Sequence, residues 1–527
     1  ERKEIAIMRR SVVLSLTVMF AASAVAAAPV SFALDGEGND SDGYAESYDE
    51  YENDDQQQQQ YVEKDTSWFD YYDQQDTYEI STEADLLGLA SLVNEQQVDK
   101  WKPTRLENFE GITFVLTRDI KLTSSDWSPI GTGGASYFAG IFDGNGHTIS
   151  GLEIDIESGS AGLFGYLVGT VKDLTVEGNI SSGDGNCGGI AGILADTGQI
   201  TGCSANVSVS GRDKVGGIAG YNDGGLIESC MNYGSISGAY KVGGIVGENW
   251  GGIVNMCGNR GDIESTRRGV GTYGTGGIAG RSVSSDSRVT ESFNSGKISS
   301  NTEATGGVVG YMNASGATVS ECYNTGEITV KGRNGNKNIS ESYAGGVIGT
   351  VGAVGVVVEN CYNSATVTGA DISGGVIGYY INESGDNSED KYMSHNYYPG
   401  GTFSSGIGAL YNKDDRQAED ATTGISARSF SNISSSLSTV YKNDDGIYGN
   451  NGYPVLVWQE AVDESEKVYM EEIPEDVQRE LDAYLAENAE TSLYGHSIVR
   501  LFSLSSYIND ALITYNEEME KAEKATK

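Results

Sequence analysis

Proline, histidine and positive charge are all scarce in this 527-residue chain. It has 6 Pro, 3 His and 34 Lys or Arg against 75 Asp or Glu, so its formal net charge is −41. Because affinity for nucleic-acid phosphates needs clustered cations, nucleic acid is not expected as a partner. The few prolines, together with 72 glycines that follow no collagen-like period, indicate many tight turns rather than a Pro-rich disordered chain.

The lack of histidine also limits metal chemistry. His147, His395 and His496 are far apart, and the sequence contains no His-Glu-x-x-His, so a zinc peptidase is not expected. His147 lies in "GNGHTI" and is interpreted as a turn or cap residue. The six cysteines do not follow zinc-site spacing. We therefore predict no metal and no cofactor.

Long hydrophobic runs are missing except near the start of the chain. Met8-Arg9-Arg10 precedes an apolar, Ala-rich stretch from Ser11 to Ala28, and small residues then offer cleavage sites up to Ala33. We predict a signal peptide with a short upstream extension over residues 1–33. No later run is long enough to span a bilayer. The expected location is secreted or at the bacterial cell surface, with no membrane span after signal removal.

Residues 34–79 form an acidic, Tyr- and Gln-rich tract that includes "SYDEYENDDQQQQQ". It lacks aliphatic periodicity and is predicted to be a disordered spacer. Ser81 or Thr82 then resembles a helix N-cap, and Leu86, Leu89 and Val93 follow on one helical face. Residues 80–160 are expected to form an N-terminal helical cap and the first coils of the fold that follows.

Residues 161–403 carry a repeat with two motifs in fixed phase. The second glycine of "GG-aliphatic-x-G", or of its leading variant, stands at positions 162, 189, 217, 244, 277, 307, 346 and 375. A cysteine follows each of five of these glycines by 13 to 15 residues, and Ser292 and Leu174 fill the same slot in two other units. Aliphatic residues stand three before the slot and six after it. Such phasing indicates a repeat architecture.

The repeat predicts an all-β fold, a β-solenoid of short parallel strands with one repeat per coil. Its glycines and β-branched residues exclude helical repeats. The glycine pairs are expected to supply φ > 0 corners and close backbone approach, and the aliphatic columns to fill the interior. The cysteines are expected to be buried free thiols. An asparagine ladder is predicted two residues after the cysteine slot, at Asn232, Asn259, Asn294, Asn324 and Asn363.

"VGGIVGENWGGIVNMC", "CYNTGEITV" and the upstream "WSPIGTGGASYFAGIFDGNGHTISGLEI" resemble bacterial exported proteins with GLUG repeats. Such repeats are known from streptococcal immunoglobulin A1-specific metallopeptidases and many large surface proteins. The resemblance implies a right-handed parallel β-helix at the cell surface. It does not imply catalysis, because in those peptidases a separate zinc domain cuts the substrate. The resemblance extends to "NNGYPVLVW", which is expected to close the array, so residues 404–460 are predicted to be closing coils. Residues 461–527, with Leu481 and Leu485 on one face, predict a C-terminal α-helical segment.

Four tyrosines form the candidate binding surface. The residue just after "GG-aliphatic-x-G" is Tyr166, Tyr221, Tyr311 and Tyr379 in half of the units. Aromatic residues ranked along a rod can stack on sugars or anchor a protein partner, and they can also simply cover coil corners. The partner classes are a host glycan, an extracellular protein or a component of the bacterial envelope.

We therefore expect a non-catalytic secreted or cell-surface β-solenoid that acts as an adhesion or spacer scaffold. Two alternatives stay open. One is a carbohydrate-active parallel β-helix, a polysaccharide lyase or glycoside hydrolase, whose acidic site is not recognisable by motif. The other is a fragment of a larger surface protein.

Overall fold

The computed structural model describes residues 62–69, 75–94, 108–124, 127–266, 273–332, 340–381, 392–410, 422–430, 433–444, 450 and 452–459. These residues belong to one compact unit, Asp55–Val462. The predicted signal peptide, most of the predicted spacer and the predicted C-terminal helical segment lie outside the described residues.

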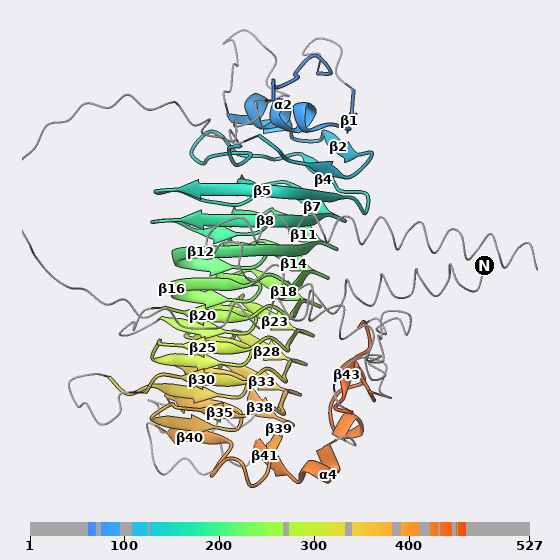
Figure 1. The fold of residues 1–527 in the computed structure, drawn as a ribbon. Helices are drawn as coiled ribbons and strands as arrows, with labels where there is room; N and C mark the ends of the chain where they lie inside the picture. Colours follow the sequence, from blue (N-terminus) through green and yellow to red (C-terminus); the bar gives the residue numbers. More distant parts are fainter. Residues whose placement is uncertain are drawn as a thin grey trace, which may run out of the picture. The chain divides into compact units, whose positions relative to one another are not determined.

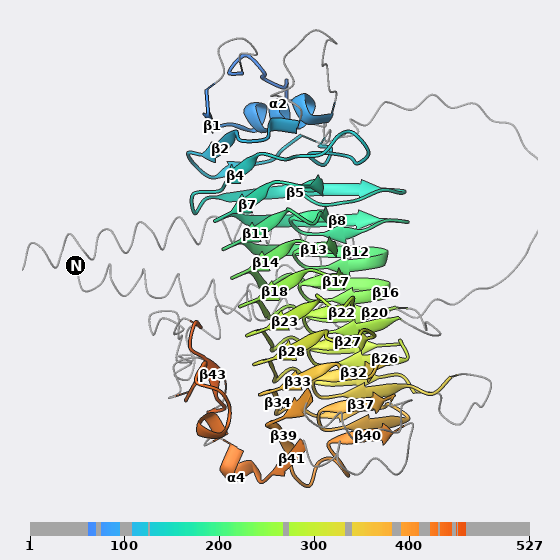
Figure 2. The same cartoon turned by 180° about the vertical axis from the view of Figure 1, so that it is seen from behind.

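The described residues form a parallel β-helix, as predicted, in which three sheets run along the stack of coils (Figures 1 and 2). Sheet A has 11 strands, and its neighbours along the sheet are one coil apart in the sequence. These strands are β1 (Thr77–Ile80), β2 (Thr113–Leu116), β4 (Ile141–Asp143), β7 (Thr170–Lys172), β11 (Gln199–Thr201), β14 (Leu226–Glu228), β18 (Ile253–Asn255), β23 (Arg288–Thr290), β28 (Thr318–Ser320), β33 (Val357–Glu359) and β38 (Met393–Ser394).

Sheet C follows the glycine pairs and has nine parallel strands. They are β6 (Phe164–Leu167), β10 (Ala191–Leu194), β13 (Ala219–Asp223), β17 (Val246–Trp250), β22 (Ala279–Val283), β27 (Val309–Met312), β32 (Ile348–Val351), β37 (Ile377–Tyr380) and β40 (Ile407–Leu410).

Sheet B lies between the cysteine slot and the next glycine pair, and all of its pairings are parallel. Its long strands are β5 (Thr148–Ile156), β8 (Thr175–Ser182), β12 (Ser204–Gly216) and β16 (Ile236–Gly243). Its short strands are β3 (Ile120–Lys121), β9 (Cys187–Gly188), β15 (Met231–Asn232), β19 (Gly258–Asn259), β20 (Ile263–Ser265), β21 (Gly274–Gly276), β24 (Phe293–Asn294), β25 (Ile298–Ser300), β26 (Ala304–Gly306), β29 (Tyr323–Asn324), β30 (Ile328–Val330), β31 (Tyr343–Gly345), β34 (Tyr362–Asn363), β35 (Val367–Thr368), β36 (Ile372–Gly374), β39 (Asn396–Pro399) and β41 (Thr422–Ile425).

Helix α2 (Glu83–Asn94) covers the first coil, which confirms the predicted helical cap. The Thr82 hydroxyl accepts a hydrogen bond from the Asp85 amide at 3.1 Å, and the Asp85 carboxylate accepts one from the Thr82 amide at 2.9 Å. This reciprocal pair satisfies amides that the helix itself leaves unpaired. Leu86 and Leu89 are fully buried. Among the helices of the described residues, none combines the length and the apolar character of a membrane span.

The predicted spacer extends too far toward this cap. Residues 77–80 form β1, which pairs with β2, and Phe69 and Tyr78 are buried in the hydrophobic core. Their rings lie 5.1 Å apart, centroid to centroid, and the Tyr78 ring is stacked on Phe114 at 5.9 Å. The described part of the tract is held in place by burial of aromatic side chains, which the acidic composition of the tract does not indicate.

The asparagine ladder is confirmed. All five asparagines are fully buried, and the side-chain Nδ2 of each of the first four donates to the Oδ1 of the next one at 2.7 to 2.9 Å. Each Nδ2 also donates to the main-chain carbonyl two residues on, at 2.8 to 3.0 Å. A shorter second ladder joins Asn222 to Asn249 at 2.9 Å. These bonds satisfy buried amides while tying each coil to its neighbours.

All six cysteines are free and buried, which confirms the thiols predicted for the slot column; Cys187 lies outside that column. In the slot column, each thiol lies 3.1 to 3.3 Å from the carbonyl oxygen two residues before it, to which it donates. Burial raises the pKa of Cys203, Cys230 and Cys322 well above that of a solvated thiol. These groups are therefore protonated packing residues rather than nucleophiles.

The expected role of the glycine pairs is half wrong. None of the second glycines from 189 to 375 has a positive φ. A Cβ on Gly244 would lie 2.2 Å from the Gly277 carbonyl oxygen and 2.4 Å from Asn259 Cγ, so close approach to the next coil and to the ladder is the reason for glycine there. The left-handed corner instead precedes the cysteine slot, where Ser229, Met256 and Glu321 have φ values of 54°, 51° and 51°.

The predicted closing coils end earlier than residue 460. After β41, the described residues among 427–430, 433–444, 450 and 452–459 form a strap. It contains α4 (Ala427–Phe430), the 3-10 helix η3 (Ile433–Ser436) and the antiparallel pair β42 (Tyr441–Lys442) and β43 (Val455–Leu456). The strap runs back along the outside of the coils (Figures 1 and 2). It packs on an aromatic column formed by the residues that follow the slot, namely Phe293, Tyr323, Tyr362 and Tyr397. Its far end is anchored where Trp458 Nε1 donates to the Glu291 carbonyl at 2.9 Å.

Candidate binding face

The four predicted tyrosines stand in one column of sheet C. The strand register aligns Tyr166 with Ile193, Tyr221, Glu248, Arg281, Tyr311, Thr350, Tyr379 and Ala409 in successive coils. The neighbouring positions one residue on, such as Leu194, Asn222 and Asn249, are buried in the interior. Because side chains alternate along a strand, the tyrosine positions face outward. We call this set the outer column.

The structure does not bring all four rings together. With about 4.8 Å per coil, Tyr221 and Tyr311 are roughly 14 Å apart along the stack, and Tyr166 and Tyr379 each lie roughly 10 Å beyond one of them. Tyr311 is buried, with 9% of its surface exposed, and the other three are half-buried. The rings therefore flank the middle of the column rather than form a continuous aromatic strip.

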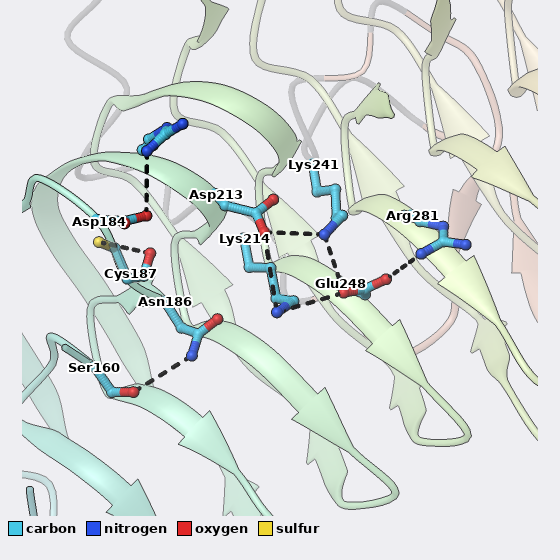
Figure 3. A network of polar contacts seen from close by, with 11 residues as sticks. Ser160, Asp184, Asn186, Cys187, Asp213, Lys214, Lys241, Glu248 and Arg281 are labelled. Carbon is cyan, nitrogen blue, oxygen red and sulfur yellow. Dashed lines mark hydrogen bonds and ion pairs between the residues drawn. The ribbon is translucent and has the colours of Figure 1, made fainter. Parts of the chain in front are cut away.

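The middle of the column, Glu248 and Arg281, belongs to a charged cluster. Its other members, Asp213, Lys214 and Lys241, lie on β12 and β16 of sheet B. Figure 3 shows Glu248 lying between the three cations. Its carboxylate is 2.6 Å from Arg281 Nη1, 3.5 Å from Lys241 Nζ and 3.9 Å from Lys214 Nζ. The Glu248 side chain is only 4% exposed. Burial of a carboxylate is costly unless it is paired, and here three cations supply the pairing.

Asp213 extends the cluster on the sheet B side of the corner. Its Oδ2 lies 3.0 Å from Lys241 Nζ and 4.0 Å from Lys214 Nζ. Three cations and two carboxylates give the cluster one excess positive charge, whereas the chain as a whole carries −41. The cluster therefore gathers three cations on one part of an acidic protein, and Asp223, which accepts a hydrogen bond from the Tyr221 hydroxyl at 3.2 Å, adds a further carboxylate beside it.

The lysines owe their positions to the backbone at the corner before each glycine pair. Lys214 and Lys241 have φ values of 52° and 46°, which is uncommon for residues with a side chain. Strand pairing places the same position of later coils at Gly274, Ala304 and Tyr343. Two consecutive coils thus put a lysine where later coils have other side chains.

Aromatic rings frame the cations. Lys214 Nζ lies 4.8 Å from the Tyr221 ring centroid, and Arg281 Cζ lies 5.9 Å from that of Tyr311. Both distances allow cation–π attraction. Burial, with Asp223 as a further cause, raises the pKa of Tyr221, and burial raises that of Tyr311. Both phenols therefore remain neutral hydrogen-bond donors at neutral pH.

An exposed tryptophan lies beside the cluster. Trp250 is two residues after Glu248 in β17, so it points to the same side of the sheet about 7 Å away, and 48% of its surface is exposed. At the two ends of the column, Tyr166 lies 6.3 Å from Tyr137, and Tyr379 stacks on Tyr343 at 4.5 Å between centroids. The face therefore combines cations with accessible aromatic surface.

The sequence-based reasoning missed the charged cluster, although a signal was present. The slot after "GG-aliphatic-x-G" holds Glu248 and Arg281 in two consecutive units, and "KVGG" stands before Tyr221 (Lys214) and before Glu248 (Lys241). Because only the tyrosines at this position were considered, the charged residues at the same position were overlooked. The spatial pairing of the lysines with the slot also requires the corner geometry, which the repeat alone does not give.

A second polar surface lies on the outside of sheet B. Two shallow hollows of about 600 and 260 Å³ share Asp155, Ser181 and Ser210 in their linings. Glu153 accepts a hydrogen bond from Asn179 Nδ2 at 2.7 Å, and Asp155 accepts one from the Ser181 hydroxyl. Serines continue the same outer rows in the following coils. The surface is rich in hydroxyl groups and open to solvent.

Metal-ligand groups do not gather in the part of the chain that the structure describes: no group of three or more His, Cys, Asp or Glu there could hold an ion. His147 Nδ1 lies 3.2 Å from Asp119, which also accepts a hydrogen bond from the Thr148 amide. The His147 amide donates to the Gly144 carbonyl at 2.8 Å, so His147 belongs to a turn, as predicted. His395 occupies the left-handed corner, with φ of 53°. His496 lies outside the described residues.

Comparisons with known proteins give limited matches. No family model matches the chain. A 140-residue stretch is 32% identical to halomucin of Haloquadratum walsbyi, covering 25% of this chain. The match spans only about 2% of halomucin. A crystal structure of a candidate immunoglobulin A1 protease from Bacteroides ovatus aligns with a TM-score of 0.41 and 19% identity, over 73% of this chain and 93% of that one.

Proposed function

We propose that this protein is a non-catalytic β-solenoid, secreted or displayed at the bacterial cell surface, that binds an extracellular ligand through the outer column of sheet C. The observation that supports this proposal is the shared column of Tyr166, Tyr221, Tyr311 and Tyr379. The β-helix holds these side chains on rigid strands, which limits the entropy lost on binding. Partners of the proposed kind are a host glycan, an extracellular protein or an envelope component.

The proposal is tested by binding of the full chain to glycan and extracellular-protein arrays. The double variant Tyr166→Ala, Tyr221→Ala is expected to weaken binding about tenfold or more, since both rings are half-buried and each aromatic contact contributes about 0.5–1.5 kcal/mol beyond area burial. Tyr233→Ala is the matched control, because Tyr233 is 49% exposed and follows β15 in sheet B. Circular dichroism checks that each variant is folded. Equal loss in the control and the double variant would contradict the assigned face.

A second candidate is a carbohydrate-active enzyme at the hollows of sheet B. Glu153 and Asp155 are both exposed and two residues apart in β5, so they share one face at about 7 Å. Carboxyl groups of inverting glycosidases stand about 6.5–9.5 Å apart. Turnover of any polysaccharide that is lost in Asp155→Asn and kept in Glu264→Gln would favour this enzyme over the scaffold. Glu264 offers an exposed acid farther along sheet B.

A further inference from the structure

We infer that the charged cluster selects an anionic glycan, one whose sugars carry carboxylate or sulfate groups. This inference rests on the proposed function, because it assigns a ligand class to the same face. It begins with cationic groups that the protein leaves incompletely paired. Lys214 Nζ makes ion pairs at 3.9 and 4.0 Å and no hydrogen bond within the described residues. A lysine ammonium has three donors, so it can bind another anion.

Arg281 is also incompletely paired. Its Nη1 donates to Glu248 at 2.6 Å, and its Nε is buried without a hydrogen-bond partner among the described residues, so Nη2 is the group left to meet a ligand. Lys214 and Arg281 are 23% and 17% exposed, so both are partly shielded from water. Electrostatic attraction is stronger where water is partly excluded. A carboxylate or sulfate on a ligand would meet cations that already stand in place.

Neutralising Glu248 does not account for the whole cluster. Arg281 at 2.6 Å and Lys241 at 3.5 Å already pair with that carboxylate. Lys214 adds a third cation to a region where the rest of the chain is strongly acidic. Salt screens charges that lie more than about 8 Å away, so the cations that a ligand touches influence its binding more than the net charge of −41 does. A ligand must therefore reach this face closely to be held.

The aromatic residues indicate a sugar rather than an acidic peptide. Tyr221 and Tyr311 flank the cluster along the outer column, and Trp250 leaves 48% of its surface open beside it. Flat aromatic faces stack well on pyranose rings. Two neighbouring sugars of one chain could occupy this face, one with its acidic group near the cations and the other with its ring stacked on Trp250. Acidic glycans combine these two features in each unit.

The experiment measures binding of the full chain to three short probes by calorimetry. The probes are a hexasaccharide of galacturonate, its fully methyl-esterified neutral form and a sulfated oligosaccharide of similar length, with poly-glutamate as a peptide-like polyanion. Preference of about tenfold for the carboxylated or sulfated probe over the neutral one supports the inference. The stronger of the two identifies the anionic group.

Three variants assign the preference to the cluster. Lys214→Gln is expected to weaken anionic binding about tenfold and leave neutral binding unchanged, whereas Lys297→Gln, an exposed lysine just before β25, should change neither. Glu248→Gln raises the excess charge by one and should tighten anionic binding several-fold. If the cluster were purely structural, Glu248→Gln would not gain affinity.

The outcomes separate the two proposals. Equal binding of charged and neutral probes, still lost in the double tyrosine variant, would overturn the anionic inference and leave the proposed function standing. Equal weakening by Lys297→Gln would attribute the effect to bulk charge, and stronger binding of poly-glutamate would replace the glycan with an acidic protein. Both results overturn the inference. If none of the probes and no array ligand bound, the proposed function itself would fail.

Discussion

Replacement of one asparagine in the buried ladder should destabilise the whole β-helix. In Asn294→Ala the protein loses three hydrogen bonds: from Asn259 Nδ2 at 2.7 Å, to Asn324 Oδ1 at 2.8 Å and to the Gly296 carbonyl at 2.9 Å. Each buried hydrogen bond contributes about 1 kcal/mol net. The expected loss is therefore about 3 kcal/mol in the free energy of unfolding.

A double-mutant cycle tests whether the bonds act as one ladder. Asn294 and Asn324 share a single bond, which either single variant removes. The double variant Asn294→Ala, Asn324→Ala should therefore be less destabilised than the sum of the single variants. The difference is expected to be about 0.5–1.5 kcal/mol, the net contribution of one hydrogen bond.

The assay is urea unfolding of the full chain followed by circular dichroism, with amide hydrogen exchange to locate the weakened coils. Asn206→Ala is the control, because Asn206 is exposed on β12 and should change stability by less than about 0.5 kcal/mol. Asn294→Ala with the stability of the control would refute the ladder as a stabilising element. Strict additivity in the cycle would refute the coupling between coils.

Four further variants test the left-handed corner, a glycine pair and a buried thiol. Ser229 and Gly202 both occupy the left-handed corner, at φ of 54° and 62°. In thermal unfolding, Ser229→Gly should therefore stabilise the protein by about 0.5–1 kcal/mol and Gly202→Ser should destabilise it by a similar amount. Stability changes of the same sign would contradict this explanation. Gly244→Ala should cost about 3 kcal/mol in urea unfolding, since its Cβ would lie 2.2 Å from a carbonyl oxygen of the next coil, and a neutral effect would show that the coils can separate freely. Burial raises the pKa of Cys187 from 9.0 to about 12, so the contribution of this thiol to stability is complete below pH 9 and is lost as the pH rises to about 12. In Cys187→Ala this part of the decrease in melting temperature at alkaline pH should disappear. An unchanged decrease would show that other groups cause it.

Features that repeat once per coil could be predicted from the sequence. In a β-helix the residue that follows by one repeat is also the neighbour in the next coil, so sequence register and spatial register coincide. This is why the asparagine ladder, the buried cysteine column and the shared column of Tyr166 and Tyr221 followed from spacing alone. The same argument could not give φ values, and the left-handed corner was assigned to the wrong residues.

The strap could not be predicted in this way because it breaks the repeat. The described residues of the strap contact coils that lie far earlier in the chain, for example where the Tyr441 hydroxyl donates to the Asn360 carbonyl at 3.0 Å. A weak signal does exist. The residue after the cysteine slot is Met231 and Gly258 in earlier coils and becomes Phe293, Tyr323 and Tyr362 in later ones. Large aromatic residues on an outward position indicate that something covers them.

The charged cluster differs from the rest of the fold because it does not repeat from coil to coil. Interior columns and glycine pairs are constrained by packing in every coil, so their similarity reports the scaffold and nothing more. Outward positions are free to differ. In the outer column, two consecutive coils replace the usual small or aromatic residue with Glu248 and Arg281, while the neighbouring corner gains Lys214 and Lys241. These four charged residues replace the residues that other coils have at the same positions, and burying the Glu248 carboxylate among them costs desolvation free energy that uncharged side chains would not. In a repeat protein, such departures from the consensus are the positions where a ligand-binding role should be sought first.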